Sequence, residues 1–229
     1  MSQQVKYSII GSIIIALILA VSYFVSRTKK IVTENKTENT QIVEEKKSSM
    51  QNYREEVLKI HESDVIIGNV DAPVTIFEYA SYSCSHCANF TQRVYPSLKK
   101  EYIDTGKVRF ILRDFPLDEP SLRAAQLTRC VPKEGYESLS KTLFQQRQNW
   151  AYGKDFPEKL ENIAKIIGMS GADFHACMEN KEVEDIVLNY RYNVSKAYNL
   201  TSTPSFIING KKYTGNSSFS AISEYLDKL

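Results

Sequence analysis

Two cysteines, Cys84 and Cys87, form a C-x-x-C pair, a spacing that can exchange disulfides or supply half of a zinc site. The apolar run Val74–Phe77 before them predicts a strand, and Ser85–Asp104 after them predicts a helix. Cys84 would then lie at a helix N-terminus, where free backbone N–H groups and the helix dipole stabilise a thiolate. We therefore predict that Cys84 is the nucleophile and that Cys87 is the resolving cysteine.

A zinc site is the alternative interpretation of this pair. It needs four ligands, usually from a second C-x-x-C or C-x-x-H motif. The other cysteines, Cys130 and Cys177, stand alone, and the other histidines are His61 and His175. The missing half-site favours redox chemistry without a metal or cofactor, although a metal-binding module built from the C-x-x-C pair and the histidine between them stays open as a rival.

His86, between the two cysteines, would lie in the first turn of the helix. There its imidazole could stabilise the Cys84 thiolate by its charge or by a hydrogen bond. A stabilised thiolate favours the reduced form, which makes the disulfide a stronger oxidant. A surface histidine without a role is the alternative.

The composition is that of a globular protein with one additional apolar segment. The 229 residues suffice for one or two domains, and 42% are hydrophobic and 24% charged. The formal net charge is only +2, and lysine and arginine are spread along the chain. This balance gives no reason to expect a nucleic-acid partner.

Residues 1–26 read as an export signal, either a cleaved signal peptide or a retained membrane anchor. The stretch Tyr7–Val25 is almost wholly apolar, and Ala20-Val21-Ser22 offers a cleavage site. More positive charges follow this stretch than precede it, which by the positive-inside rule opposes export, although long domains translocate largely regardless of flanking charge. Residues 27–60 are polar and predict a linker.

Residues 61–229 predict an α/β domain. Two strands joined by the helix after the cysteines form a β-α-β unit, which implies a parallel pair, and a helical block then interrupts the sheet. An Asn-Gly hairpin turn and a last helix follow it. The expected elements are strands at 65–67, 74–80, 107–113, 204–208 and 211–214, helices within about 117–200, and a last helix at 218–229.

Three stretches in this order, Gly68–Val74, Phe77–Cys87 and Leu200–Lys211, resemble the bacterial periplasmic disulfide oxidoreductases of the DsbA type, in the thioredoxin superfamily. The resemblance implies a thioredoxin-like fold with an inserted all-helical subdomain. It also implies that Pro204 follows a cis peptide bond beside the active-site disulfide, and that the backbone of Thr203 pairs with a bound substrate chain. It further implies that a carboxylate at the position of Glu78 lies beneath the disulfide and relays protons to the buried cysteine. If the side chain of Glu78 pointed outward, it would be only a solvated strand residue.

The sequence departs from the best-known members at two positions. Ser85 stands where a proline is often found, and Thr203 stands where those members have valine. The resemblance implies that both positions touch the thiolate or the substrate chain, so they bear on redox potential and on the choice of partner. Outside these motifs, Cys130 and Cys177 fall in predicted helices and would pair in an oxidising compartment, contributing about 4 kcal/mol by loop entropy. Two reduced core cysteines are the alternative.

These features together predict an exported thiol–disulfide oxidoreductase that forms disulfide bonds in thiol-containing exported proteins. A membrane partner would reoxidise it, and it would act as a monomer in the periplasm, either free after signal cleavage or tethered to the inner membrane. A disulfide isomerase or reductase is the alternative within this class. A metal-binding module and a membrane-tethered adaptor without turnover are the alternatives outside it.

Overall fold

The computed structural model of the protein describes residues 22–29 and 43–229, in two units that comprise Met1–Asn52 and Tyr53–Leu229. In the first unit the described residues are helical and exposed. Within the part of the chain that is described, no helix combines the length and the apolar character that a membrane span requires. Most of the predicted export segment, and the predicted cleavage site except Ser22, lie outside the described residues.

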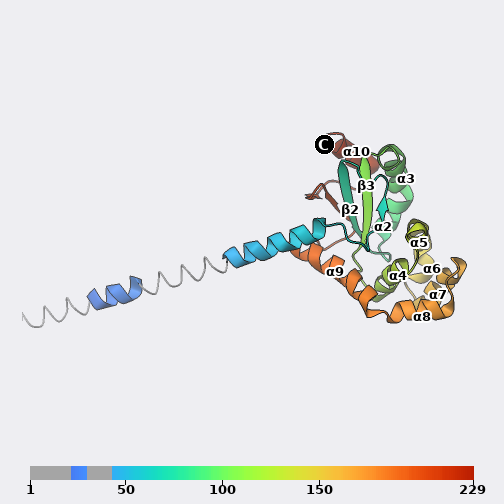
Figure 1. Cartoon of the computed structure of the whole chain (residues 1–229), viewed down its shortest axis with the longest axis horizontal. Coiled ribbons are helices and arrows are strands. Elements are labelled where there is room, and N and C mark those ends of the chain that lie inside the picture. The colour runs from blue at the N-terminus through green and yellow to red at the C-terminus, as the bar shows by residue number, and fades with distance from the viewer. Residues whose placement is uncertain (1–21, 30–42) are drawn as a thin grey trace, which may run out of the picture. The chain divides into compact units, whose positions relative to one another are not determined.

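The second unit is built on one five-stranded sheet (Figure 1). The pair β2–β3 is parallel, as the predicted β-α-β unit requires. Every other neighbouring pair is antiparallel. The strands, in their order across the sheet, are β1 (Ile66–Ile67), β3 (Val108–Asp114), β2 (Val74–Ala80), β4 (Ser205–Ile208) and β5 (Lys211–Tyr213). All five predicted strands are confirmed, and the turn between β4 and β5 has positive φ at both Asn209 and Gly210.

The helix predicted after the cysteines is present but is not a regular α-helix. It consists of α2 (Ser85–Asn89), η1 (Phe90–Val94), α3 (Tyr95–Leu98) and η2 (Lys99–Ile103), of which the two η segments are π-helical. Pro96, in the first turn of α3, has no N–H to donate. In the π-helical segments on either side of it, the Tyr95 N–H donates to the Phe90 carbonyl and the Asp104 N–H donates to the Lys99 carbonyl. Hydrogen bonds that span five residues are the disturbance expected from a proline inside a helix.

A block of six helices lies between β3 and β4, which confirms the predicted helical insertion (Figure 1). These helices are α4 (Glu119–Arg129), α5 (Lys133–Gln145), α6 (Arg147–Trp150), α7 (Phe156–Ile166), α8 (Gly171–Glu179) and α9 (Lys181–Tyr198). A disulfide joins Cys130, just after α4, to Cys177 in α8. The pairing predicted for an oxidising compartment is therefore present. The last helix is α10 (Phe219–Leu226).

The side chains on the two faces of β2 belong to different hydrophobic cores. Ile76 and Ala80 belong to the larger core, which also contains Cys87, whereas Phe77 and Tyr79 belong to a smaller core beneath α9. Because side chains alternate along a strand, Glu78 points to the same face as Ile76 and Ala80. This parity directs the Glu78 carboxyl toward the cysteines.

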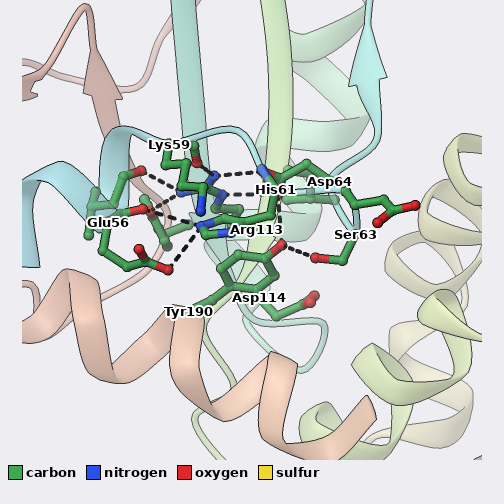
Figure 2. A network of polar contacts seen from close by, with 12 residues as sticks. Glu56, Lys59, His61, Ser63, Asp64, Arg113, Asp114 and Tyr190 are labelled. Carbon is green, nitrogen blue, oxygen red and sulfur yellow. Dashed lines mark hydrogen bonds and ion pairs between the residues drawn. The ribbon is translucent and has the colours of Figure 1, made fainter. Parts of the chain in front are cut away.

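A buried polar network fixes the segment that precedes β1 (Figure 2). Arg113, on β3, forms an ion pair with Asp64 at 2.6 Å and donates to the carbonyls of Val57 and Lys59. Both side chains of the pair are almost fully buried, and Tyr190 of α9 donates to the second oxygen of Asp64 at 2.9 Å. A described helix ends at Leu58, so the Arg113 guanidinium satisfies carbonyls at the C-terminus of this helix that have no partner within it. The compact unit begins at Tyr53, eight residues before the predicted boundary at residue 61.

Candidate active site

Cys84 lies where β2 passes into α2. It is the N-cap residue of α2, with an extended backbone, and no side chain caps this end of the helix. The first N–H groups of α2 are thus left for the sulfur. Cys84 is partly exposed and Cys87 is fully buried, and both are free thiols in this structure. The strand-to-helix position predicted from the C-x-x-C spacing is confirmed.

The surroundings of Cys84 favour its thiolate. The Cys87 thiol donates a hydrogen bond to the Cys84 sulfur, the backbone N–H groups of Cys87 and His86 add to it, and the Thr203 side chain acts in the same direction. These donors outweigh partial burial and lower the pKa of Cys84 to about 5. The sulfur is therefore ionised at neutral pH.

The surroundings shift the pKa values of the two cysteines in opposite directions. Burial raises the pKa of Cys87 well above that of an ordinary thiol, and its hydrogen bond to Cys84 and the charge of Glu78 act in the same direction. A proton shared by the pair therefore stays on Cys87 while Cys84 carries the charge. This asymmetry matches the predicted division into an attacking and a resolving cysteine.

Glu78 lies on β2, buried to 2% exposure. Burial, with the negative charge of Cys84 as a smaller cause, raises the pKa of its carboxyl to about 8. Its Oε1 atom has no hydrogen-bond partner among the described residues. A buried carboxyl that can gain or lose a proton near neutral pH therefore lies on the cysteine side of the sheet.

The loop before β4 brings Thr203 and Pro204 to the cysteines. The peptide bond between them is cis, as the resemblance implied. The Cys84 sulfur lies 3.4 Å from the Thr203 carbonyl oxygen, to which it donates when it is protonated. The Thr203 side chain lowers the pKa of both cysteines, although its buried hydroxyl has no hydrogen-bond partner within the described chain.

His86 is exposed, and the hydrogen bond that it gives to the Cys84 sulfur comes from its backbone N–H. A tuning role for its imidazole stays a prediction. Across residues 22–29 and 43–229, no three His, Cys, Asp or Glu side chains converge in the way that metal ligands do.

Two residues of the site carry no signal in the sequence. Arg147 of α6 donates to the Ser83 carbonyl at 3.1 Å, and the Ser121 hydroxyl of α4 accepts from the Tyr82 N–H at 2.9 Å. Both lie far from the motif along the chain, and their residue types are common on surfaces. Only the packing of the insertion brings them to the active-site loop.

Comparison with known proteins agrees with this geometry. A protein-family model described as thioredoxin matches residues 61–228, and the chain therefore belongs to the thioredoxin family. The crystal structure of alpha-DsbA1 from Wolbachia pipientis superposes with a TM-score of 0.70 and 32% identity, over 76% of this chain and 94% of that one. The predicted resemblance to the DsbA type is confirmed by this neighbour.

Two relatives are named putative protein-disulfide oxidoreductases. The one from Rickettsia prowazekii is 32% identical over 210 residues, which cover 89% of this chain and 76% of the relative. The one from Rickettsia conorii is 35% identical over 171 residues, which cover 74% of this chain and 61% of the relative. The chain thus matches only about three fifths of the length of the second relative.

Proposed function

We propose that the protein is a thiol–disulfide oxidoreductase that forms disulfide bonds in exported proteins. The observation that carries the proposal is the partly exposed Cys84 at the N-terminus of α2, with a pKa lowered to about 5, beside the buried Cys87. A relative named as a putative protein-disulfide oxidoreductase, 32% identical over 89% of this chain, supports the same reaction.

The reaction starts from the oxidised pair. A substrate thiolate attacks the Cys84 sulfur, a substrate–Cys84 disulfide forms, and the Cys84–Cys87 bond breaks with Cys87 leaving as a thiolate. Cys87 then takes up a proton, as its raised pKa favours. A second substrate thiolate attacks the substrate sulfur of the mixed disulfide and releases Cys84 as a thiolate. The substrate has lost two electrons, which the reduced cysteine pair now holds.

The direction of transfer follows from the Cys84 thiolate. A group that is stabilised as an anion is a good leaving group and stabilises the reduced protein relative to the disulfide. Glu78, buried on the same side of the sheet, would exchange the proton of Cys87. The Thr203 backbone and Pro204 would hold the substrate chain beside Cys84, and the His86 imidazole would help to stabilise the thiolate.

The cellular setting belongs to the same proposal. The protein would act in the periplasm, after signal cleavage or tethered to the inner membrane, on thiol-containing exported proteins. Because each cycle leaves the cysteine pair reduced, a membrane partner that accepts two electrons must regenerate the disulfide. The catalytic unit would act as a monomer.

Equilibration of the purified protein with glutathione buffers tests the proposal. We expect a potential clearly more oxidising than that of the glutathione couple, together with oxidation of a reduced, unfolded substrate that Cys84→Ser abolishes. A Cys130→Ala/Cys177→Ala variant, which lacks only the distant disulfide, should keep the activity. A potential far below the glutathione couple would contradict the proposal and indicate a reductase.

A further inference from the structure

The loop Ser81–Ser83, directly before Cys84, is held by the helical insertion. The Ser81 hydroxyl donates to Ser121 Oγ at 2.7 Å, and the same oxygen of Ser121 accepts from the Tyr82 N–H at 2.9 Å. Ser81 and Ser121 are both fully buried. The Cys84 N–H donates to the Ser81 carbonyl at 3.0 Å, so the position of this loop determines where the Cys84 sulfur lies.

Arg147 holds the third residue of the loop and brings a positive charge to it. Its guanidinium donates to the Ser83 carbonyl at 3.1 Å, and the side chain of Tyr152 covers it at 5.0 Å from the ring centre. Arg147 is only 6% exposed, yet it forms no ion pair with a carboxylate in the described chain. The other buried arginines, Arg113 and Arg129, each have an aspartate partner.

A buried charge without a counter-ion is costly, and such charges are usually paired. Cys84, whose sulfur becomes negative in the reduced protein, directly follows Ser83, the residue whose carbonyl Arg147 binds. We propose that Arg147 is a positioning residue for the reaction proposed above. It fixes the Ser83 carbonyl, and its charge is balanced by the Cys84 thiolate when the protein is reduced.

The interaction between Arg147 and the Cys84 thiolate affects the equilibrium between the disulfide and the reduced form. The disulfide form has no negative sulfur, so the charge of Arg147 is uncompensated there and compensated in the reduced form. Arg147 therefore favours reduction of the cysteine pair and makes the disulfide a stronger oxidant. Tyr152, which is 64% exposed, shields the guanidinium from water and so strengthens the effect.

Titration of the Cys84 thiolate by its absorbance at 240 nm, together with equilibration against glutathione, tests this inference in the full protein. We expect Arg147→Gln to raise the thiolate pKa by roughly half to one unit, because it removes a nearby opposite charge. The equilibrium constant with glutathione should shift 3- to 10-fold toward the disulfide form, or about 15 to 30 mV.

Two further variants separate charge from structure. Arg147→Lys keeps the charge and should restore most of the thiolate pKa, which a merely structural role would not do. Tyr152→Ala lies at the surface and should shift the pKa in the same direction by less, even if Arg147→Gln does not fold. As a matched control, Arg123→Gln removes an insertion arginine that pairs with Glu184 and should leave both quantities unchanged.

Unchanged thiolate pKa values in Arg147→Gln and Tyr152→Ala would overturn the inference, and so would a failure of Arg147→Lys to restore the value. These results differ from failure of the proposed function. In that case the wild-type protein itself would titrate like an ordinary thiol, or its potential would lie below the glutathione couple.

Discussion

Replacement of Glu78 by glutamine should stabilise the protein, and by an amount that depends on pH. The carboxyl is buried and its pKa is raised from 4.5 to about 8. In the folded state it is therefore protonated at neutral pH, whereas in the unfolded chain it is ionised. Folding at pH 7 must take up this proton, which costs free energy, and Glu78→Gln removes that cost.

The magnitude follows from the two pKa values. Each pH unit above the unfolded pKa costs about 1.4 kcal/mol until the folded pKa is reached. At pH 7 the cost is therefore about 3 kcal/mol, and it vanishes below pH 4.5. The sign agrees with linkage: a group whose pKa is raised on folding adds most stability below its unfolded pKa and loses it as pH rises through the folded value.

Urea unfolding at several pH values between 4 and 8 measures this difference. The oxidised protein is suitable, because the Cys84 thiolate is then absent and burial, the larger cause of the Glu78 shift, remains. We expect the stability gain of Glu78→Gln to grow from near zero at pH 4 to about 3 kcal/mol at pH 7. The exposed Glu134→Gln serves as the matched control. Parallel pH profiles for Glu78→Gln and wild type would refute the reasoning.

Three other changes have defined outcomes. Asp64→Asn leaves its buried arginine without a counter-ion and should lower the free energy of unfolding by about 3 to 5 kcal/mol in urea titrations, whereas a loss below 1 kcal/mol would contradict a buried pair. Loss of the Cys130–Cys177 bond by double alanine substitution should cost about 4 kcal/mol in the same assay, while an unchanged midpoint would speak against the bond. Thr203→Val removes a side-chain hydroxyl that lowers the pKa of Cys84, so the thiolate pKa measured at 240 nm should rise, whereas a fall would contradict that effect.

Local pattern was enough to predict the elements that present Cys84. An apolar run, a C-x-x-C pair and a following helical pattern are short-range signals. The Asn-Gly pair is another, because it favours the positive φ angles of a two-residue hairpin turn. The parity of Glu78 could not be read from the sequence, because β2 is buried on both faces and its residues do not alternate in polarity. Only the packing of Ile76 and Ala80 with Cys87 decides it.

Contacts between segments that are distant in the sequence could not be predicted from local sequence patterns. Arg113 lies in the predicted strand 107–113, where an arginine reads as a solvent-facing residue, yet it closes a buried pair with Asp64. Arg147 has no sequence feature that connects it to Ser83. In both cases the chemistry depends on which helix packs on which strand, and a single sequence does not contain that information in local form.

Because it contains the disulfide Cys130–Cys177, the protein is itself a product of disulfide formation, the reaction that it is proposed to carry out. A newly made chain has four thiols, and two of them must be oxidised by another agent before the insertion is closed between α4 and α8. In a reducing compartment that closure would not form, and the insertion that anchors the active-site loop would be left without its covalent link. A disulfide donor of this kind must therefore first receive a disulfide bond during its own maturation.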